Sequence, residues 1–372
     1  MLTAVVILAL LIAFLSTVPP VSKDALVHHL AVPKIYLRHG GMVELPSMPF
    51  SYYPANLELL YWGALALGSD ILPKYIHFAF ALATAWLLFR HLKRKLSPAY
   101  GALGALLFLS VPVIVKLSIT VYIDLGVICF TFCAVLLLLE WLEKGMRVRY
   151  LMASALFCGL AVGTKYNGLI ALFLLTLSVP FFYARRGAAA RGRSVRAIGL
   201  GAGYFLAAVL VCSPWLVRNH QWTGNPLHPL YRQWFTASSE RGDGGLKEAL
   251  AEKAAPQKVG HGMFTYRREV YGESGWEIAL LPLRIFFQGK DGNPQYFDGK
   301  LHPFLLVLPL FAFLRSREGP DAERLEKAYL LAFAVLFFAF ALFSRTLRIR
   351  YIGPIVPPLV ILSVFGVRNL LA

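Results

Sequence analysis

Five ionisable residues lie at the ends of long apolar runs or in the tight turns between them. They are Asp24, Asp124, Lys165, Arg348 and Arg350. Charges are unfavourable beside hydrocarbon and are usually kept there for function, so this placement indicates a polar active site at a lipid boundary. A carboxylate in such a site can accept a proton from a hydroxyl group, and the cations can bind an anionic group such as phosphate.

Asp24 follows Pro19-Pro20 directly after the first apolar run. One interpretation is a helix N-cap, because aspartate before an apolar-periodic run is a favoured cap. The other is a general base, since partial burial at the interface is expected to raise the pKa of Asp24 toward a useful range. The two roles can coexist.

Asp124 begins the fourth apolar run, and Lys116 ends the third. An aspartate that starts an otherwise uncharged span is unfavourable without a partner. We therefore count Asp124 with Asp24 as a catalytic candidate that contacts the substrate or the network around Asp24, with a structural cap as the alternative. Tyr122 and Lys116 join the candidate substrate-binding residues.

The cations lie in turns that the topology below places outside the membrane. Lys165 is in GTKYNGL, and Arg345, Arg348 and Arg350 are in SRTLRIRYIGPIVPP. The positive-inside rule disfavours cations on this face, so they need a reason to be there. Arginine offers a bidentate fork to phosphate oxygens and lysine a point charge, which predicts a phosphate or diphosphate ligand. Snorkelling toward lipid phosphates is the alternative.

The remaining candidates for substrate binding are polar or aromatic residues in the same external regions. They are His29, Tyr53, Glu58, Arg218, His220 and Tyr351. His28 and His29 are adjacent, so on a helix they point about 100° apart and cannot form a two-ligand metal pair by themselves. No HExxH spacing, P-loop or GxGxxG helix start occurs. We predict no cofactor and no metal, with a divalent metal as the less favoured alternative.

The elements that position these residues follow from composition. The chain has 372 residues, of which 58% are hydrophobic and 15% charged. Its repeated apolar runs approach the ~20 residues that a helix needs to span a bilayer, and they lack strand-like alternation. This predicts an all-α, polytopic membrane protein. The net charge of +17 lies mostly in short loops, and no nucleic-acid-binding motif accompanies it, so nucleic acid is not expected. The four cysteines are in apolar segments and are read as small core residues: Cys129, Cys133, Cys158 and Cys212.

Three basic clusters, at 90–95, 144–149 and 185–196, are expected to face the cytoplasm. The first run lacks a basic n-region and an A-x-A site, so it is treated as an uncleaved span. About ten spans result, with both termini cytoplasmic: 1–18, 75–90, 99–115, 121–141, 150–164, 167–184, 197–214, 301–315, 328–344 and 352–368.

Two external loops interrupt this single membrane domain of residues 1–372. The first, 19–74, is predicted to carry helices at 24–38 and 56–68, the second of which is too short to cross and is read as interfacial. The second loop, 215–300, contains the polar run LKEALAEKAA. This run is either a mobile flap over a site or a solvated loop.

At these residues the chain resembles the GT-C superfamily of polytopic glycosyltransferases, in particular bacterial relatives of protein O-mannosyltransferases and of the lipid A aminoarabinose transferase. The resemblance rests on Asp24 and, in chain order, on SYYPANLELLYW, YIDLGV, GLAVGTKYNGL, SPWLVRNHQWTGNPLHP and RIRYIGPIVPP.

The resemblance implies a bacterial inner-membrane enzyme that moves a sugar from a polyprenyl-phosphate donor to an acceptor hydroxyl on the periplasmic face, with inversion. Asp24 would be the general base, and Lys165 with Arg348 or Arg350 would hold the lipid phosphate. The acceptor can be a lipid, a glycan or a protein. Monophosphate donors of this kind do not generally require a metal.

The chain departs from these relatives in two motifs. Lys23-Asp24 replaces the paired Asp-Glu of the protein mannosyltransferases, and the run from Tyr53 to Leu57 replaces Lys-Pro-Pro-Leu of the aminoarabinose enzyme, without its lysine. Phosphate contacts are therefore expected from other cations. Many relatives continue into further spans and a soluble domain, so the chain is expected to be a minimal core or to need a partner subunit.

Two other classes fit the same pattern. A transporter or flippase for a lipid-linked or anionic solute would also place charges among helices, but such folds usually show related halves and broken helices at mid-membrane. A non-catalytic subunit of a membrane complex is the other alternative.

Overall fold

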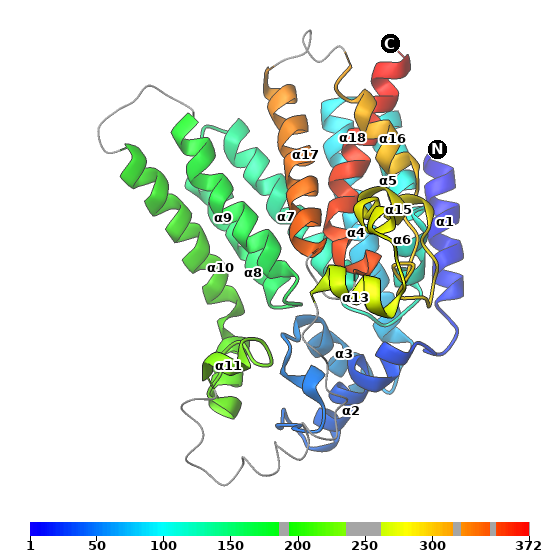
Figure 1. Cartoon of the computed structure of the whole chain (residues 1–372), viewed down its shortest axis with the longest axis vertical. Coiled ribbons are helices and arrows are strands. Elements are labelled where there is room, and N and C mark those ends of the chain that lie inside the picture. The colour runs from blue at the N-terminus through cyan, green and yellow to red at the C-terminus, as the bar shows by residue number, and fades with distance from the viewer. Residues whose placement is uncertain (186–192, 236–261, 315–320, 343–346, 372) are drawn as a thin grey trace.

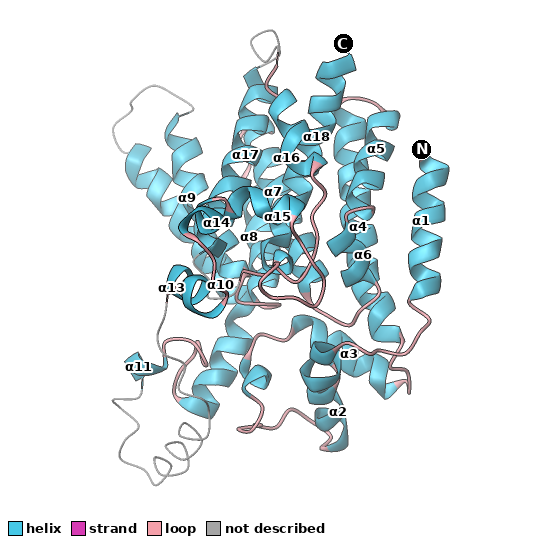
Figure 2. Cartoon of the chain, turned by 45° about the vertical axis from the view of Figure 1, so that its right-hand side comes forward, coloured by secondary structure: helices cyan, strands magenta, loops and turns pink. Residues whose placement is uncertain are grey.

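The computed structural model describes residues 1–185, 193–235, 262–314, 321–342 and 347–371. Within these residues the regular structure is helical, apart from one isolated bridge between Lys290 and Phe297 (Figure 2). The helices, with 3-10 and π turns marked η, are α1 Leu2–Leu15, η1 Ala25–His29, α2 Ala31–Arg38, η2 Pro49–Tyr52, α3 Asn56–Ala66, α4 Leu72–Lys95, α5 Pro98–Leu109, α6 Pro112–Ser118, α7 Asp124–Glu143, α8 Val148–Val162, α9 Gly168–Arg185, α10 Arg193–Thr223, α11 Arg232–Phe235, α13 Met263–Val270, α14 Gly275–Ala279, α15 Leu281–Phe287, α16 Phe304–Phe311, α17 Asp321–Leu342, η4 Ile349–Ile355 and α18 Val356–Leu371.

The predicted all-α, polytopic membrane architecture is confirmed. Six helices of the described residues are long and apolar enough to cross a membrane, namely α4, α7, α9, α10, α17 and η4 continued by α18. The bent pair α5–α6 adds a seventh candidate, and α1 and α8 are shorter apolar helices. When the eight-residue α16 is included, each of the ten predicted spans contains a helix.

The third predicted span, 99–115, is not one straight helix. It is divided into α5 and α6, whose axes differ by 70°. The break lies just before Pro112, and Val111 has the extended backbone that a following proline imposes (φ −62°, ψ 123°). The bend brings Lys116, on α6, into contact with Asp291 and Asp298 of the second loop.

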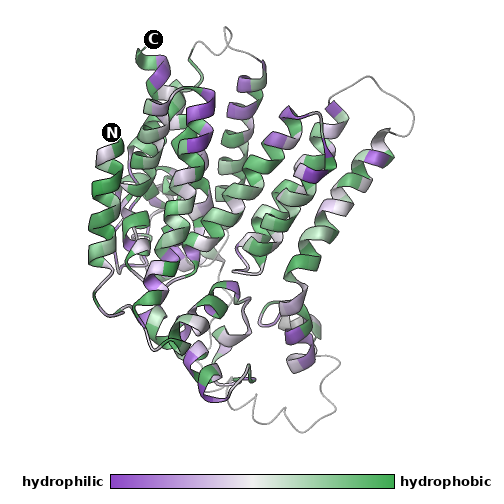
Figure 3. Ribbon diagram, turned by 180° about the vertical axis from the view of Figure 1, so that it is seen from behind, coloured by the Kyte–Doolittle hydropathy of each residue, from purple (hydrophilic) through white to green (hydrophobic). Residues whose placement is uncertain are grey.

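The two ends of the helix bundle differ in composition. Both termini lie at one end, called here the termini end, together with the basic residues that end α4 and those between α7 and α8 (Figure 1). The opposite end, called the loop end, carries residues 16–71, whereas residues 262–300 lie along the side of the bundle, with α13 nearer the loop end than α15 (Figure 1 and Figure 2). Figure 3 shows the apolar residues along the helices between the two ends.

The first loop differs from its prediction in one helix. The helix predicted at 56–68 is present as α3, whereas the helix predicted at 24–38 is divided into the π-helical turn η1 and α2. Helix α3 is fixed to the turn between α8 and α9, because the Asn56 backbone N–H donates to the Gly163 carbonyl (3.0 Å) and the Asn56 side-chain amide donates to the Leu160 carbonyl (3.1 Å). Gly163 permits this approach, since a Cβ there would lie 2.5 Å from the Asn56 amide nitrogen.

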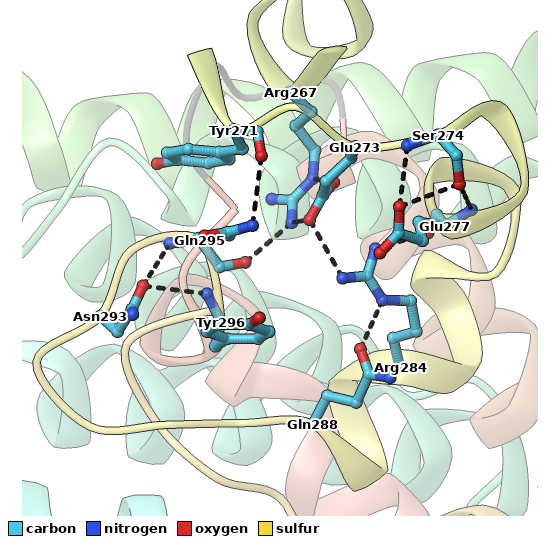
Figure 4. Close-up of polar contacts among 10 residues, drawn as sticks. All are labelled: Arg267, Tyr271, Glu273, Ser274, Glu277, Arg284, Gln288, Asn293, Gln295 and Tyr296. Carbon is cyan, nitrogen blue, oxygen red and sulfur yellow. Dashed lines mark hydrogen bonds and ion pairs between the residues drawn. The ribbon is translucent and has the colours of Figure 1, made fainter. Parts of the chain in front are cut away.

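The described part of the second loop is held together by a buried ion cluster. Glu273 accepts hydrogen bonds from Arg267 (2.7 Å to Oε1) and Arg284 (3.0 Å), and the side chains of all three are almost fully buried (Figure 4). Both guanidinium groups also face the Phe297 ring. Helix α10 continues to Thr223, past the predicted start of this loop, and the run LKEALAEKAA lies outside the described residues.

Candidate active site

Segments far apart in the chain bring four of the predicted ionic residues together at the loop end. Asp24 precedes η1, Asp124 begins α7, Lys165 lies in the turn between α8 and α9, and Arg350 lies in η4. Arg350 Nη2 donates to Asp24 Oδ2 at 2.6 Å, and Lys165 Nζ donates to Asp124 Oδ1 at 2.6 Å. The site therefore contains two ion pairs.

Two tyrosines join the pairs into one cluster. The Arg350 guanidinium lies 4.7 Å from the Tyr122 ring centroid and 5.4 Å from that of Tyr351, and Lys165 Nζ lies 4.6 Å from the Tyr351 centroid. These are cation–π distances. Asn167 donates to the Tyr351 carbonyl (3.3 Å), which fixes η4 to the turn that carries Lys165. We call Asp24, Tyr122, Asp124, Lys165, Arg350 and Tyr351 the ion-pair cluster.

The cluster keeps some hydrogen-bonding capacity unused. Asp124 is 3% exposed and Arg350 7%. Among the described residues, neither Asp124 Oδ2 nor Arg350 Nε has a hydrogen-bond partner. Buried polar atoms are nearly always satisfied, so unpaired atoms of this kind indicate contacts with a ligand or water.

Two predictions for Asp24 are wrong. Its side chain makes no capping hydrogen bond, and its backbone is already helical (φ −66°, ψ −35°), because the carboxylate is directed to Arg350 instead. Burial raises the pKa of Asp24, but the charge and hydrogen bond of Arg350 outweigh it and hold the pKa below its ordinary value. Asp24 is thus a carboxylate at neutral pH.

Histidine and glutamate side chains of the first loop adjoin the cluster. His29 Nδ1 lies 2.8 Å from Glu58 Oε1, and the His29 ring meets the Tyr122 ring edge-on at 5.9 Å. His28, which was not among the candidates, stacks on Phe50 at 4.5 Å. Burial and the neighbouring His29 lower the pKa of His28 to about 3, so its ring is neutral at pH 7.

Arg218 supports the first loop from α10. It donates to the Tyr53 carbonyl (3.1 Å) and lies between the rings of Trp215 and Trp222 at 4.8 and 4.9 Å. His220, in contrast, is exposed and bonded to the Gly224 carbonyl (3.1 Å), so the structure does not bring it to the cluster.

Lys116 and Arg348 are directed to the second loop. Asp298 lies 3.1 Å from Lys116 and 3.6 Å from Arg348, and Asp291 lies 3.3 Å from Lys116. These two candidates therefore form a separate charged group beside η4. Arg345 lies outside the described residues.

Among the described residues, no group of three or more His, Cys, Asp or Glu side chains is placed to hold a metal ion. The four cysteines of the chain are free thiols, three of them buried.

Comparison with known proteins adds the family context. Residues 59–217 match the family model described as dolichyl-phosphate-mannose-protein mannosyltransferase, a range that includes Asp124 and Lys165 but neither Asp24 nor Arg350. No curated protein gives a significant match.

Solved structures match almost the whole chain. ArnT from Cupriavidus metallidurans, bound to undecaprenyl phosphate, aligns with a TM-score of 0.61 at 16% identity, over 98% of this chain and 59% of that one. The oligosaccharyltransferase AglB from Archaeoglobus fulgidus, in complex with an inhibitory peptide and a dolichol-phosphate, aligns with a TM-score of 0.49 at 14% identity, over 99% and 50%. The chain thus spans about three fifths of the length of the ArnT structure.

The chain has the fold of the GT-C membrane glycosyltransferases, and the resemblance predicted from the sequence is confirmed.

Proposed function

We propose that this protein is a glycosyltransferase that moves a sugar from a polyprenyl-phosphate donor to an acceptor hydroxyl, with inversion at the anomeric carbon. The observation that carries the proposal is the ion-pair cluster, which holds a partly exposed carboxylate, Asp24, paired with Arg350, together with a second cation, Lys165, paired with Asp124. Such a set can deprotonate a hydroxyl group and stabilise a departing phosphate.

Asp24 is the proposed general base. Its side chain is 26% exposed, and Arg350 binds only Oδ2, which leaves Oδ1 for the acceptor proton. The pKa of Asp24, held low by Arg350, keeps the carboxylate ionised at neutral pH and ready to accept a proton, as a weaker base than a free aspartate. In a single displacement, the acceptor oxygen forms its bond to the anomeric carbon as the bond to the phosphate oxygen breaks, and the acceptor proton passes to Asp24.

Lys165 and Arg350 are the proposed phosphate ligands. An ammonium group has three N–H donors and a guanidinium five, and the ion pairs with Asp124 and Asp24 leave several of them. Arg350 Nε is among the unpaired atoms. The lipid phosphate can therefore bind without breaking either pair. That ArnT was solved with undecaprenyl phosphate supports a lipid-phosphate donor. We propose that these fixed cations replace a divalent metal.

The proposed location is a bacterial inner membrane with the loop end in the periplasm and both termini in the cytoplasm. Since the native cysteines lie in the bundle, new cysteines can report the orientation. Asp70→Cys, at the loop end, is expected to react with an impermeant thiol reagent added to intact cells, and Arg147→Cys, at the termini end, only after permeabilisation. The reverse pattern would refute the orientation.

The test of the proposed activity follows labelled sugar from polyprenyl-phosphate sugars to acceptors in membrane extracts, with the full chain in nanodiscs. Asp24→Asn is expected to lower the transfer rate by about 10²–10⁴-fold, the usual contribution of a general base. The control Asp70→Asn removes an exposed carboxylate from the same loop. Full transfer by Asp24→Asn would overturn the proposal and favour a transporter or a non-catalytic subunit.

A further inference from the structure

A pocket in the first loop lies outside the ion-pair cluster, and Asp24 is not among the residues that line it. It is bounded by η1, α2, η2 and α3, and its walls include His28, Tyr36, Phe50, Tyr53, Glu58 and Trp62. His28 follows Asp24 by one turn of η1, and the two side chains interact electrostatically. The pocket therefore approaches Asp24 through His28, and Arg350 is paired with the same carboxylate.

The walls of the pocket carry polar atoms without partners. Among the described residues, Tyr36 OH, Glu58 Oε2 and His28 Nδ1 make no hydrogen bond, although each atom is buried. The Tyr36 side chain is the clearest case, since the residue is only 4% exposed. Arg218 is not among the residues that line the pocket, but its Nη1 is also unpaired and its guanidinium interacts electrostatically with Tyr36 and Glu58. Polar atoms left in this state are satisfied by a bound molecule or by water.

These atoms are mixed in kind. The Glu58 carboxylate only accepts hydrogen bonds, the Arg218 guanidinium only donates, and the tyrosine hydroxyl and a neutral imidazole do both across their atoms. A phosphate, which only accepts, would be repelled by Glu58. A single serine or threonine hydroxyl would leave most of these atoms unsatisfied. Several adjacent hydroxyl groups, each donor and acceptor, match the set.

Aromatic rings supply the remaining surface. Tyr36 and Trp62 meet edge-on with centroids 6.2 Å apart, and Phe50 and Tyr53 stack at 6.0 Å. Rings of this kind pack against the C–H faces of an apolar or amphipathic ligand while polar groups fix its orientation. The pocket combines an aromatic wall with hydroxyl-binding groups.

We propose that this pocket binds a sugar ring and that the ring belongs to the acceptor, so that the protein glycosylates a glycan or glycolipid rather than a peptide side chain. This inference rests on the proposed function in one respect only, namely the role of Asp24 as the general base. Asp24 is paired with Arg350, a proposed phosphate ligand, and interacts with His28 of the pocket wall, so a hydroxyl of the bound ring is proposed to face its carboxylate.

The experiment measures binding without transfer. The full chain in nanodiscs is mixed with methyl glycopyranosides of the common hexoses and pentoses, and binding is followed by saturation-transfer NMR. At least one glycoside is expected to bind, and Tyr36→Phe and Glu58→Gln are each expected to weaken it about tenfold, the effect of one hydrogen bond. The control Tyr100→Phe removes a hydroxyl at the termini end, in α5.

A competition experiment tells whether the bound sugar ring belongs to the acceptor or to the donor. Undecaprenyl phosphate and synthetic polyprenyl-phosphate hexoses are both expected to leave glycoside binding intact, because the proposed donor site at the cations and the pocket share no residue. Displacement by the polyprenyl-phosphate hexoses alone would give the pocket to the donor sugar and overturn the proposal. Three other results would also overturn the proposal: no binding of any glycoside, glycoside affinity that is unchanged in both Tyr36→Phe and Glu58→Gln, or binding of a serine-containing peptide that depends on Tyr36.

Failure of this inference and failure of the proposed activity are distinguishable. Asp24→Asn is expected to abolish transfer while glycoside binding persists. If transfer depends on Asp24 but glycoside binding does not depend on Tyr36, only the proposal for the pocket is refuted.

Discussion

The ion pair between Lys165 and Asp124 offers the sharpest quantitative test of the site. The two side chains are 18% and 3% exposed, and their charged atoms are 2.6 Å apart. At an effective dielectric constant of ~20, two unit charges at that distance attract by about 6 kcal/mol before desolvation is subtracted. Breaking a buried pair by removal of one partner typically costs about 3–5 kcal/mol, because the other charge stays buried.

The two single variants are expected to differ. Lys165→Met leaves a buried carboxylate whose Oδ2 is already unpaired, although Arg350 still attracts it, so we expect a loss near the lower limit, about 3 kcal/mol. Asp124→Asn leaves an ammonium group that is partly exposed and can turn to water, so we expect a loss of about 1–2 kcal/mol. In the double variant no buried charge remains, and a total near 2 kcal/mol is expected.

The assay is reversible unfolding in mixed micelles. The parent chain, the two single variants and the double variant form a double-mutant cycle, which gives the coupling energy between Lys165 and Asp124. A thiol-reactive dye reports unfolding directly, because three native cysteines are buried: Cys129, Cys158 and Cys212. The expected coupling energy is about 2–3 kcal/mol. Additive losses in the double variant would show that the pair does not form and would refute the reasoning for the site.

Three further predictions concern the pH dependence, the helix packing and the second loop. Because Arg350 lowers the pKa of Asp24, this ion pair stabilises the fold above the ordinary carboxylate pKa, and its contribution is lost as the pH falls through the lowered pKa. The variant Arg350→Gln should therefore move the acid limb of the pH profile of the transfer rate to higher pH. An acid limb that does not move would exclude Asp24 as the base. Gly366→Ala should destabilise the protein by about 1–3 kcal/mol in the same unfolding assay, because the new Cβ would lie 2.1 Å from a backbone oxygen of α16, while Gly203→Ala, which meets open space, should not. Glu273→Gln leaves two buried guanidinium groups without their carboxylate, so amide exchange should accelerate across 263–300 and not in α7; equal protection would show that the ion cluster does not hold this loop.

The composition of the site was readable from the sequence, whereas its pairing was not. Asp24, Asp124, Lys165 and Arg350 are conspicuous because each interrupts or borders an apolar run, and the topology places them at one end of the bundle. Which cation meets which carboxylate depends on contacts across long separations. Asp24 and Arg350 are 326 positions apart, so nothing local to Asp24 could show that its pKa falls rather than rises.

The same limit explains the cations that the structure directs elsewhere. Lys116 and Arg348 have the charge and the topology expected of phosphate ligands, but Asp298 of the second loop lies beside both. Tyr36 and His28 were missed for the opposite reason. They lie in an amphipathic stretch without an unusual spacing, and only the packing of α2 against α3 leaves their polar atoms unpaired.

The different surroundings of the two carboxylates separate their roles. Asp124 is buried at the start of α7, one oxygen held by Lys165, with no exposed face on which to receive an acceptor. Asp24 is partly exposed, has one oxygen held by Arg350, and lies one helical turn before His28, which lines a pocket with unpaired polar groups. A proton acceptor must reach both the substrate and, after transfer, the solvent, whereas a residue that positions a cation has to remain in place. The arrangement therefore favours Asp24 as the base and Asp124 as the residue that holds Lys165 over Tyr351, where the donor phosphate is proposed to bind.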